Sequence, residues 1–368
     1  MLSDVGYKTC FAGKWQQSDG DYGIAQRGWQ KYLVFMPFQG SESQRVNRYK
    51  NPKLYKNGSY LPASETTGKY SEDMFSDYLC AFIDSSNSQG NPVDTTVFDT
   101  TIIDSTIIPD STLPDTTVIG NTARAPFLAV YSFNLAGKPY VPTPDDPEYA
   151  NWDPALDNAN SNAKYYGSMV QYMDKTIGKI LDKLQQDGIA DNTYIFYLSA
   201  TAVFRDVTSV WGPTYKNLKG GKMHSDLWGT LNPLLVYCPS KVTPRTDRTT
   251  LIDYTDFLPT LADLTNTPRP FDYGTLDGVS FADNIWGIPG EDRSWVFCHW
   301  DNDATKSPPV QRWVNDTMYK LYDTLGYTKF YNTVKDTMEK KPIPDYKLTV
   351  TERLIKQNFI TILQQEHN

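Results

Sequence analysis

The segment from residue 165 to residue 239 constrains the fold most, because it combines one long helix pattern with two short apolar strands. Apolar residues three or four positions apart predict an amphipathic helix that ends near Gly188, a typical C-cap. The runs at 194–198 and 234–238 are nearly all apolar, which is typical of strands buried on both faces of a parallel sheet. We therefore predict an α/β fold with a doubly wound, mostly parallel sheet. The residues after Leu198 should then lie at its carboxyl edge, where such folds place their chemistry.

The remaining elements of the main domain are less regular but agree with this fold. A helical turn capped by Gly6 should precede a strand at 8–12, and a second buried strand is expected at 125–133. A helix is predicted at 71–83, where acidic residues occupy the first turn. A strand end followed by a helix is predicted at 250–264. The apolar face of the helix at 71–83 consists of Met74, Phe75, Tyr78, Leu79 and Phe82.

A small C-terminal subdomain is predicted for residues 291–368, after a main domain at 1–290. Strands are expected at 295–300 and at 313–322, the second with one face covered because its apolar residues alternate. Thr349 and Glu352 have the spacing of a capping box, which predicts the start of a last helix. Together these elements indicate an antiparallel sheet packed against one helix. The apolar stripe of the helix is expected to contain Leu354, Ile355, Phe359, Ile362 and Leu363.

Residues 85–124 differ in composition from the rest of the chain. Within 94–118, short units such as DTTVF and DSTII repeat, each with an Asp, two hydroxyl residues and two mostly apolar residues. The repeat of five residues matches neither a helix nor a simple strand, so we expect short strands or turns broken at each Asp. Two interpretations stay open: an exposed low-complexity insertion, or a segment that pairs with the main sheet.

Composition excludes several classes of function. The net charge is −8 over 368 residues, and no stripe of Lys and Arg interleaved with aromatic residues occurs, so nucleic acid is not an expected partner. No run of about 18 apolar residues occurs, so no membrane span is predicted. The first residues lack the basic and apolar regions of a signal peptide. The four cysteines are widely spaced, mostly in apolar surroundings, which favours free thiols.

Several motifs resemble the sulfatase family of the alkaline-phosphatase-like fold. They are LSDVGYKTCFAGKW near the start, the segment 169–199, GGK at 220–222 and LIDYTDFLPTLADL, in the family order and over nearly the whole chain outside 85–124. The resemblance implies hydrolysis of sulfuric esters. The family uses a formylglycine made from Cys or Ser, a calcium ion held by Asp and Asn, two Lys and two His. It also suggests a secreted or periplasmic protein.

The positions that the resemblance assigns to catalysis have mostly changed. No Cys or Ser is followed by x-Pro-x-Arg, and the N-terminal segment with the nucleophile and the metal-binding acidic pair is expected to be absent. Ala200 and Thr201 stand where the family has Asp and Asn, so we expect no calcium or other cofactor. Gln16 and Gly137 stand at the two His positions.

Two lysines of the family pattern remain, Lys14 and Lys222, which grip sulfate in relatives; here they are either anion-binding groups or inherited loop residues. His224 and Asp226 are additions to the pattern, and His224 is the third candidate for anion binding. His299 and His367 belong to no evident constellation.

Three hypotheses follow. The first is a pseudosulfatase, catalytically inactive, with a binding, structural or assembly role. The alternative is an active sulfuric ester hydrolase of the arylsulfatase type whose N-terminal nucleophile and metal segment is not in this chain. The third is a filament-forming protein that pairs with itself or another protein through an exposed sheet edge or through 94–118. The expected partners are thus another protein chain or a small anion.

Overall fold

The computed structural model describes residues 1–17, 20–35, 47–87, 124–211, 215–269, 274–300, 311–324 and 327–366. The chain divides into two compact units, Leu2–Asn134 and Leu135–Asn368, with Met1 belonging to the second. These two units do not test the predicted boundary between a main domain at 1–290 and a subdomain at 291–368, which stays a prediction. The repeat at 94–118 and His367 lie outside the described residues, so their expectations also stay predictions.

The unit Leu2–Asn134 is built on a five-stranded sheet with the order β4-β3-β2-β1-β5. Strands β1, β2 and β5 are parallel, and the short strands β3 and β4 continue the sheet as an antiparallel hairpin. The parallel strands confirm both strand predictions, at 8–12 and at 125–133. Because β1 is paired on both sides, its backbone groups are satisfied and its apolar residues are buried. The strands are β1 (Lys8–Lys14), β2 (Lys31–Phe35), β3 (Tyr55–Lys56), β4 (Ser59–Tyr60) and β5 (Phe127–Ser132).

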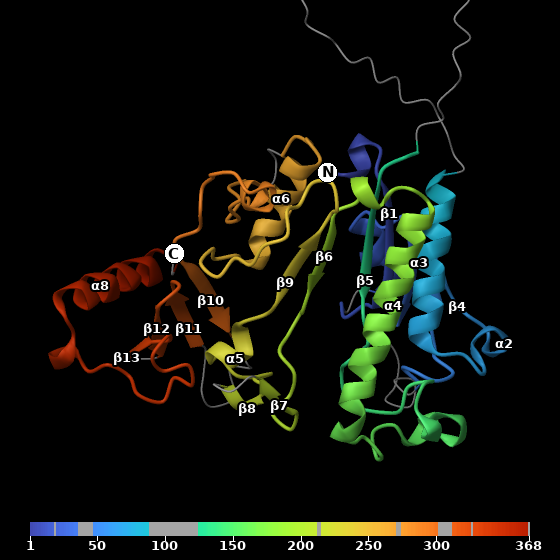
Figure 1. Cartoon of the computed structure of the whole chain (residues 1–368), viewed down its shortest axis with the longest axis horizontal. Coiled ribbons are helices and arrows are strands. Elements are labelled where there is room, and N and C mark those ends of the chain that lie inside the picture. Colours follow the sequence, from blue (N-terminus) through green and yellow to red (C-terminus); the bar gives the residue numbers. More distant parts are fainter. Residues whose placement is uncertain are drawn as a thin grey trace, which may run out of the picture. The chain divides into compact units, whose positions relative to one another are not determined.

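Helix α3 (Ser71–Asn87) covers this sheet, as Figure 1 shows for its course beside β5 and β1. Phe75, Leu79 and Phe82 of the predicted apolar face are buried. Phe82 meets Phe127 of β5 edge to face, with ring centroids 6.1 Å apart. The unit also contains α1 (Gly20–Gln26), α2 (Ala63–Thr66) and the 3-10 turn Ser3–Val5, which Gly6 closes in the left-handed conformation as predicted.

The first α-helix of the unit Leu135–Asn368 is the predicted amphipathic helix, α4 (Tyr166–Gln186), which follows the 3-10 turns Pro147–Asn151, Pro154–Leu156 and Ala163–Tyr165. Met169 and Leu184 are buried, and Gly188 follows the helix with φ of +67°, which confirms the C-terminal signal. The helix predicted within 250–264 is present as α6 (Phe257–Leu264), and the 3-10 turn Tyr254–Asp256 runs directly into it. The strand end predicted before it is wrong, because Leu251 forms only an isolated bridge with Arg293. The other helices are α5 (Leu227–Thr230), α7 (Ala282–Trp286) and α8 (Val350–Gln365).

For the two apolar strands predicted at 194–198 and 234–238, the expected place in a parallel sheet is wrong. Strand β6 (Ile195–Leu198) and strand β9 (Leu234–Tyr237) pair antiparallel with each other as a two-stranded sheet, with Ile195 opposite Tyr237. Leu235 is 61% exposed, so β9 is not buried on both faces. A short apolar run fits an antiparallel ladder as well as a parallel one, and the choice depends on long-range pairing. The residues after Leu198 therefore follow an antiparallel strand. A second hairpin contains β7 (Thr208–Trp211) and β8 (Tyr215–Lys219).

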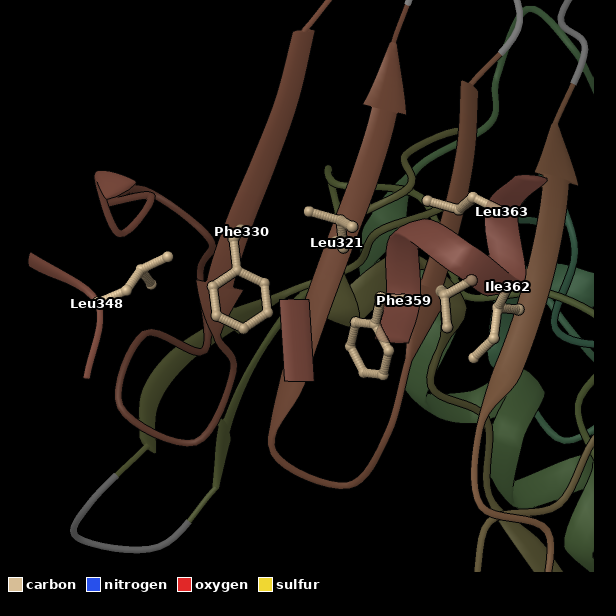
Figure 2. Packing of buried hydrophobic residues seen from close by; sticks show 7 residues of the cluster. Leu321, Phe330, Leu348, Phe359, Ile362 and Leu363 are labelled. Carbon is tan, nitrogen blue, oxygen red and sulfur yellow. The ribbon is translucent and has the colours of Figure 1, made fainter. Parts of the chain in front are cut away.

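The C-terminal sheet is antiparallel, with the order β10-β11-β12-β13, and α8 packs on it. Figure 2 shows Phe359, Ile362 and Leu363 of α8 in one cluster with Leu321 and Phe330 of the sheet. The predicted capping box is present at the start of α8, but Leu354 of the expected stripe is 68% exposed. The strands are β10 (Val296–Trp300), β11 (Gln311–Asn315), β12 (Tyr319–Thr324) and β13 (Tyr327–Asn332).

Two further predictions for this sheet need correction. The segment 313–322 forms parts of β11 and β12, because the chain turns at residues 316–318, where Asp316 accepts the backbone N–H groups of Met318 and Tyr319. The expected single covered face is also wrong, since Lys320 and Leu321 point to opposite faces and both are buried.

The cysteines and the helices bear on two composition-based predictions. All four cysteines are free thiols, as expected, and burial raises the pKa of Cys10 to about 12. Among the helices of the described residues, none combines the length and the apolar character that crossing a bilayer would require.

Candidate functional site

Lys14 and Gln16 lie at the carboxyl end of β1 in the unit Leu2–Asn134. A Cβ atom added at Gly13 would lie 2.0 Å from the carbonyl oxygen of Ser132, so only glycine allows β1 to approach β5 this closely. The Trp15 N–H donates to the Phe35 carbonyl at 2.9 Å, which fixes the backbone directly after Lys14. Lys14 is half-buried and Gln16 is exposed. The sequence motif thus places a lysine and a neutral amide at the end of a rigid parallel strand.

Ala200 and Thr201 follow β6 in the unit Leu135–Asn368, and both are exposed. The Ser199 hydroxyl donates to the Thr201 carbonyl oxygen at 2.7 Å, which closes a tight turn. A hard cation such as calcium needs several oxygen ligands, and an alanine side chain supplies none. Within the described ranges, no group of three or more His, Cys, Asp or Glu residues could hold a metal ion. The residues that the structure places here do not fit a calcium site.

The loop with Lys222 runs beside the segment that follows Ala202. The Lys222 N–H donates to the Val203 carbonyl at 3.0 Å. A Cβ atom added at Gly220 would lie 2.2 Å from the carbonyl oxygen of Val203. A Cβ atom added at Gly221 would lie 2.3 Å from backbone atoms of Trp228 and Gly229. Both glycines are therefore required by close backbone contacts. They bring the Lys222 ammonium over the Phe204 ring, 4.9 Å from its centroid.

The same phenyl ring receives a second lysine from the loop after β5. Lys138 directly follows Gly137, and its ammonium lies 4.7 Å from the Phe204 ring centroid. Its Nζ atom also pairs with Asp206 at 2.5 Å. Tyr140, two residues further on, is buried; burial raises its pKa to about 12, with the Asp206 carboxylate as a smaller cause. Phe204 thus joins the Gly137 and Lys222 positions, which are far apart in the sequence.

The remaining candidates of this loop, His224 and Asp226, have different surroundings. His224 is exposed, and its backbone N–H donates to the Gly221 carbonyl at 3.0 Å. Asp226 is the N-cap of α5, accepts the Gly229 N–H at 3.1 Å and pairs with Arg205. These contacts give Asp226 a structural role in closing the loop. His299 lies on β10.

The far end of the loop is held by a buried polar cluster of the C-terminal sheet. The Ser225 carbonyl accepts hydrogen bonds from Lys320 Nζ at 2.5 Å and from the Tyr322 hydroxyl at 2.7 Å. Glu339 bonds both of these side chains and accepts the Leu227 N–H at 2.7 Å. Lys320 is 2% exposed, and burial lowers its pKa while Glu339 opposes that effect. The sheet therefore fixes the loop that carries Lys222.

The structure divides the predicted candidates between the two units. Gly137, Ala200, Thr201, Lys222 and His224 lie in one unit, and Lys14 and Gln16 lie in the other. Sequence reasoning missed Lys138, Phe204, Asp206 and the Lys320 cluster. The position of Lys138 next to Gly137 was an available signal. The burial of Lys320 was not available, because a lysine in an alternating strand is normally on the solvent face.

Comparisons with known proteins agree with this architecture. The family model described as Sulfatase matches residues 1–267. The uncharacterized sulfatase YdeN of Escherichia coli (strain K12) is 23% identical over 398 residues, covering 100% of this chain; the chain spans 62% of the length of that relative.

Two solved structures extend the likeness to the fold. The crystal structure of Ps i-CgsB in complex with k-i-k-neocarrahexaose has a TM-score of 0.67 and 16% identity, covering 99% of this chain and 72% of that one. The structure of BT4656 in complex with its substrate D-Glucosamine-2-N, 6-O-disulfate has a TM-score of 0.62 and 14% identity, covering 99% and 80%. At such identities the likeness shows the fold alone.

Proposed function

Because the chain belongs to the sulfatase family, we propose that it is a pseudosulfatase, which binds a sulfated saccharide and does not hydrolyse it. The observation that carries this proposal is the sequence Ala200-Thr201-Ala202 after β6, at the family's metal-binding Asp-Asn position. A segment supplied from elsewhere could not add ligands to these side chains. The changes at Gln16 and Gly137 point the same way, because an acid is needed to protonate the leaving group.

Binding is supported by the lysines that remain. Lys222 is held by close glycine contacts and by the buried Lys320 cluster, so its backbone is positioned before a ligand arrives. Lys14 is likewise fixed next to Gly13 at the end of β1. Ammonium groups donate charge-assisted hydrogen bonds to anionic oxygens. The saccharide class is suggested by the two solved neighbours, one in complex with k-i-k-neocarrahexaose and one with D-Glucosamine-2-N, 6-O-disulfate.

Two measurements test the proposal. In the first, 4-methylumbelliferyl sulfate with calcium should give no turnover above buffer. In the second, D-glucosamine-2-N,6-O-disulfate at about 100 times its Kd should stabilise the protein by about 2.7 kcal/mol, whereas unsulfated D-glucosamine should not. Lys222→Ala should remove the stabilisation. Lys175→Ala, which removes an exposed lysine paired with Asp145, is the control and should keep it.

The alternative is an active sulfuric ester hydrolase, and the same assay distinguishes it. Turnover that disappears in Lys222→Ala would support hydrolysis and contradict the pseudosulfatase. Absence of both turnover and ligand-induced stabilisation would leave the binding proposal without support.

A further inference from the structure

We propose that Lys138 is a second anion-binding cation of this site, and that Asp206 is an internal counter-ion which the ligand's anionic group must displace. This inference rests on the proposed function, because it concerns the same ligand. It adds to that function a pair of residues that the catalytic pattern of the family does not assign, and it names the feature of the ligand that they recognise.

The first argument is the shared aromatic ring. Lys138 and Lys222 both place their ammonium groups within 5 Å of the Phe204 centroid, at 4.7 Å and 4.9 Å. The two charges are therefore separated by no more than about 10 Å, roughly one Debye length at 0.1 M salt, and each raises the positive potential at the other. An oxyanion bound at either ammonium group would lower this potential.

The second argument is the ion pair itself. Lys138 Nζ lies 2.5 Å from Asp206, and the two side chains are 41% and 45% exposed. An ion pair with this exposure contributes little to stability, because solvent screens it. A sulfate group with several terminal oxygens can therefore compete with one carboxylate for Lys138. Because the pair is exposed, a ligand can reach Lys138 without unfolding the loop.

The third argument is the surroundings of Asp206. The adjacent cation, Arg205, is engaged by Asp226, the N-cap of α5. The Tyr140 ring centroid lies 5.7 Å from the Lys138 ammonium, and its hydroxyl stays protonated at neutral pH because burial raises the pKa of Tyr140 to about 12. Asp206 therefore places a negative charge in direct contact with Lys138. It should repel an approaching anion and hold Lys138 until the anion replaces it.

Substitution of Asp206 and substitution of Lys138 should change the affinity for the ligand in opposite directions. Titration calorimetry with D-glucosamine-2-N,6-O-disulfate at low salt should show tighter binding for Asp206→Asn, by about 3- to 5-fold, since one exposed ion pair no longer competes. Lys138→Ala should weaken binding about 10-fold, the size of one charged hydrogen bond. In the double variant, Asp206→Asn should raise the affinity of Lys138→Ala by less than about 2-fold, because Asp206 competes with the ligand only for Lys138.

The matched control is the exposed pair Lys175 and Asp145, which has the same composition and also lies beside an aromatic ring, that of Tyr172. Lys175→Ala and Asp145→Asn should each leave the Kd unchanged within about 2-fold, since the two residues lie outside this site. Thermal melts of all variants report whether they remain folded, as expected for exposed substitutions.

The outcomes separate the two proposals. If Lys222→Ala removes binding while Lys138→Ala and Asp206→Asn have no effect, the binding function stands and this inference is wrong. If Asp206→Asn weakens binding, the counter-ion role is wrong. If neither the wild type nor Asp206→Asn binds the disulfated sugar, both proposals fail.

Discussion

At the scale of single residues, the described part of the chain contains both buried and exposed ion pairs, and their consequences differ. Asp256 is 1% exposed and accepts hydrogen bonds from Arg293 Nη2 at 2.5 Å and from the backbone N–H of Val279 at 2.7 Å. It also bonds the N–H of Asp253 at 2.7 Å, so one carboxylate joins three segments around α6. A buried carboxylate of this kind depends on its cation, because solvent cannot replace the lost partner.

We predict that Arg293→Leu lowers the free energy of unfolding by about 3 kcal/mol or more, because it leaves the Asp256 carboxylate buried without its cation. Arg269→Leu is the control, since its pair with Asp263 is largely exposed, and it should change stability by less than about 1 kcal/mol. Urea unfolding curves of both variants provide the comparison. Equal losses in the two variants would show that burial of the pair is not the deciding factor.

At the scale of elements, helix α8 shows how a sequence signal becomes a local structure. Thr349 Oγ1 accepts the Glu352 N–H at 3.2 Å, and the Glu352 carboxylate accepts the Thr349 N–H at 2.9 Å. The hydrogen bond from the Thr349 backbone N–H is the largest cause that lowers the pKa of Glu352, followed by the hydrogen bond that the Thr349 hydroxyl donates to the same carboxylate at 2.8 Å. From this capped start, helix α8 runs so that Phe359 and Ile362 pack against the C-terminal sheet (Figure 2).

Glu352→Ala should lower the free energy of unfolding by about 1 kcal/mol at pH 7, the usual contribution of a cap. Because the folded-state pKa is depressed, this contribution is complete above the ordinary value of 4.5 and is lost as the pH falls through the lower folded value. The difference between wild type and variant should therefore shrink in acid. Gln365→Ala, at the other end of α8, is the control; a difference that grows in acid would contradict the sign.

At the scale of the whole molecule, the chain has the sulfatase fold. The parallel strands β2, β1 and β5 form one sheet with a buried cluster, and α8 packs on the C-terminal sheet. The changes that we propose in the catalytic groups concern side chains at strand ends and in loops, such as Ala200 and Gly137. Loops can change in this way without loss of the fold, because their side chains contribute little to the core.

The calcium dependence of stability is a property of the whole molecule and follows from Ala200 and Thr201. A ligand that binds only the native state raises the melting temperature. We predict that millimolar calcium, compared with a chelator, shifts the melting temperature by less than about 1 °C. Differential scanning calorimetry would show this directly. A rise of several degrees would contradict this prediction.

The sequence alone determined the family, the element types and several local signals, including the cap of α8 and the glycine that ends α4. These depend on residues close together in the chain, where periodicity and capping patterns act. Only the tertiary structure decided that β6 pairs antiparallel with β9, that Lys320 is buried and that Lys138 meets Lys222 at Phe204. The physical reason is that strand pairing, burial and charge clustering depend on contacts between distant segments, which local patterns do not encode.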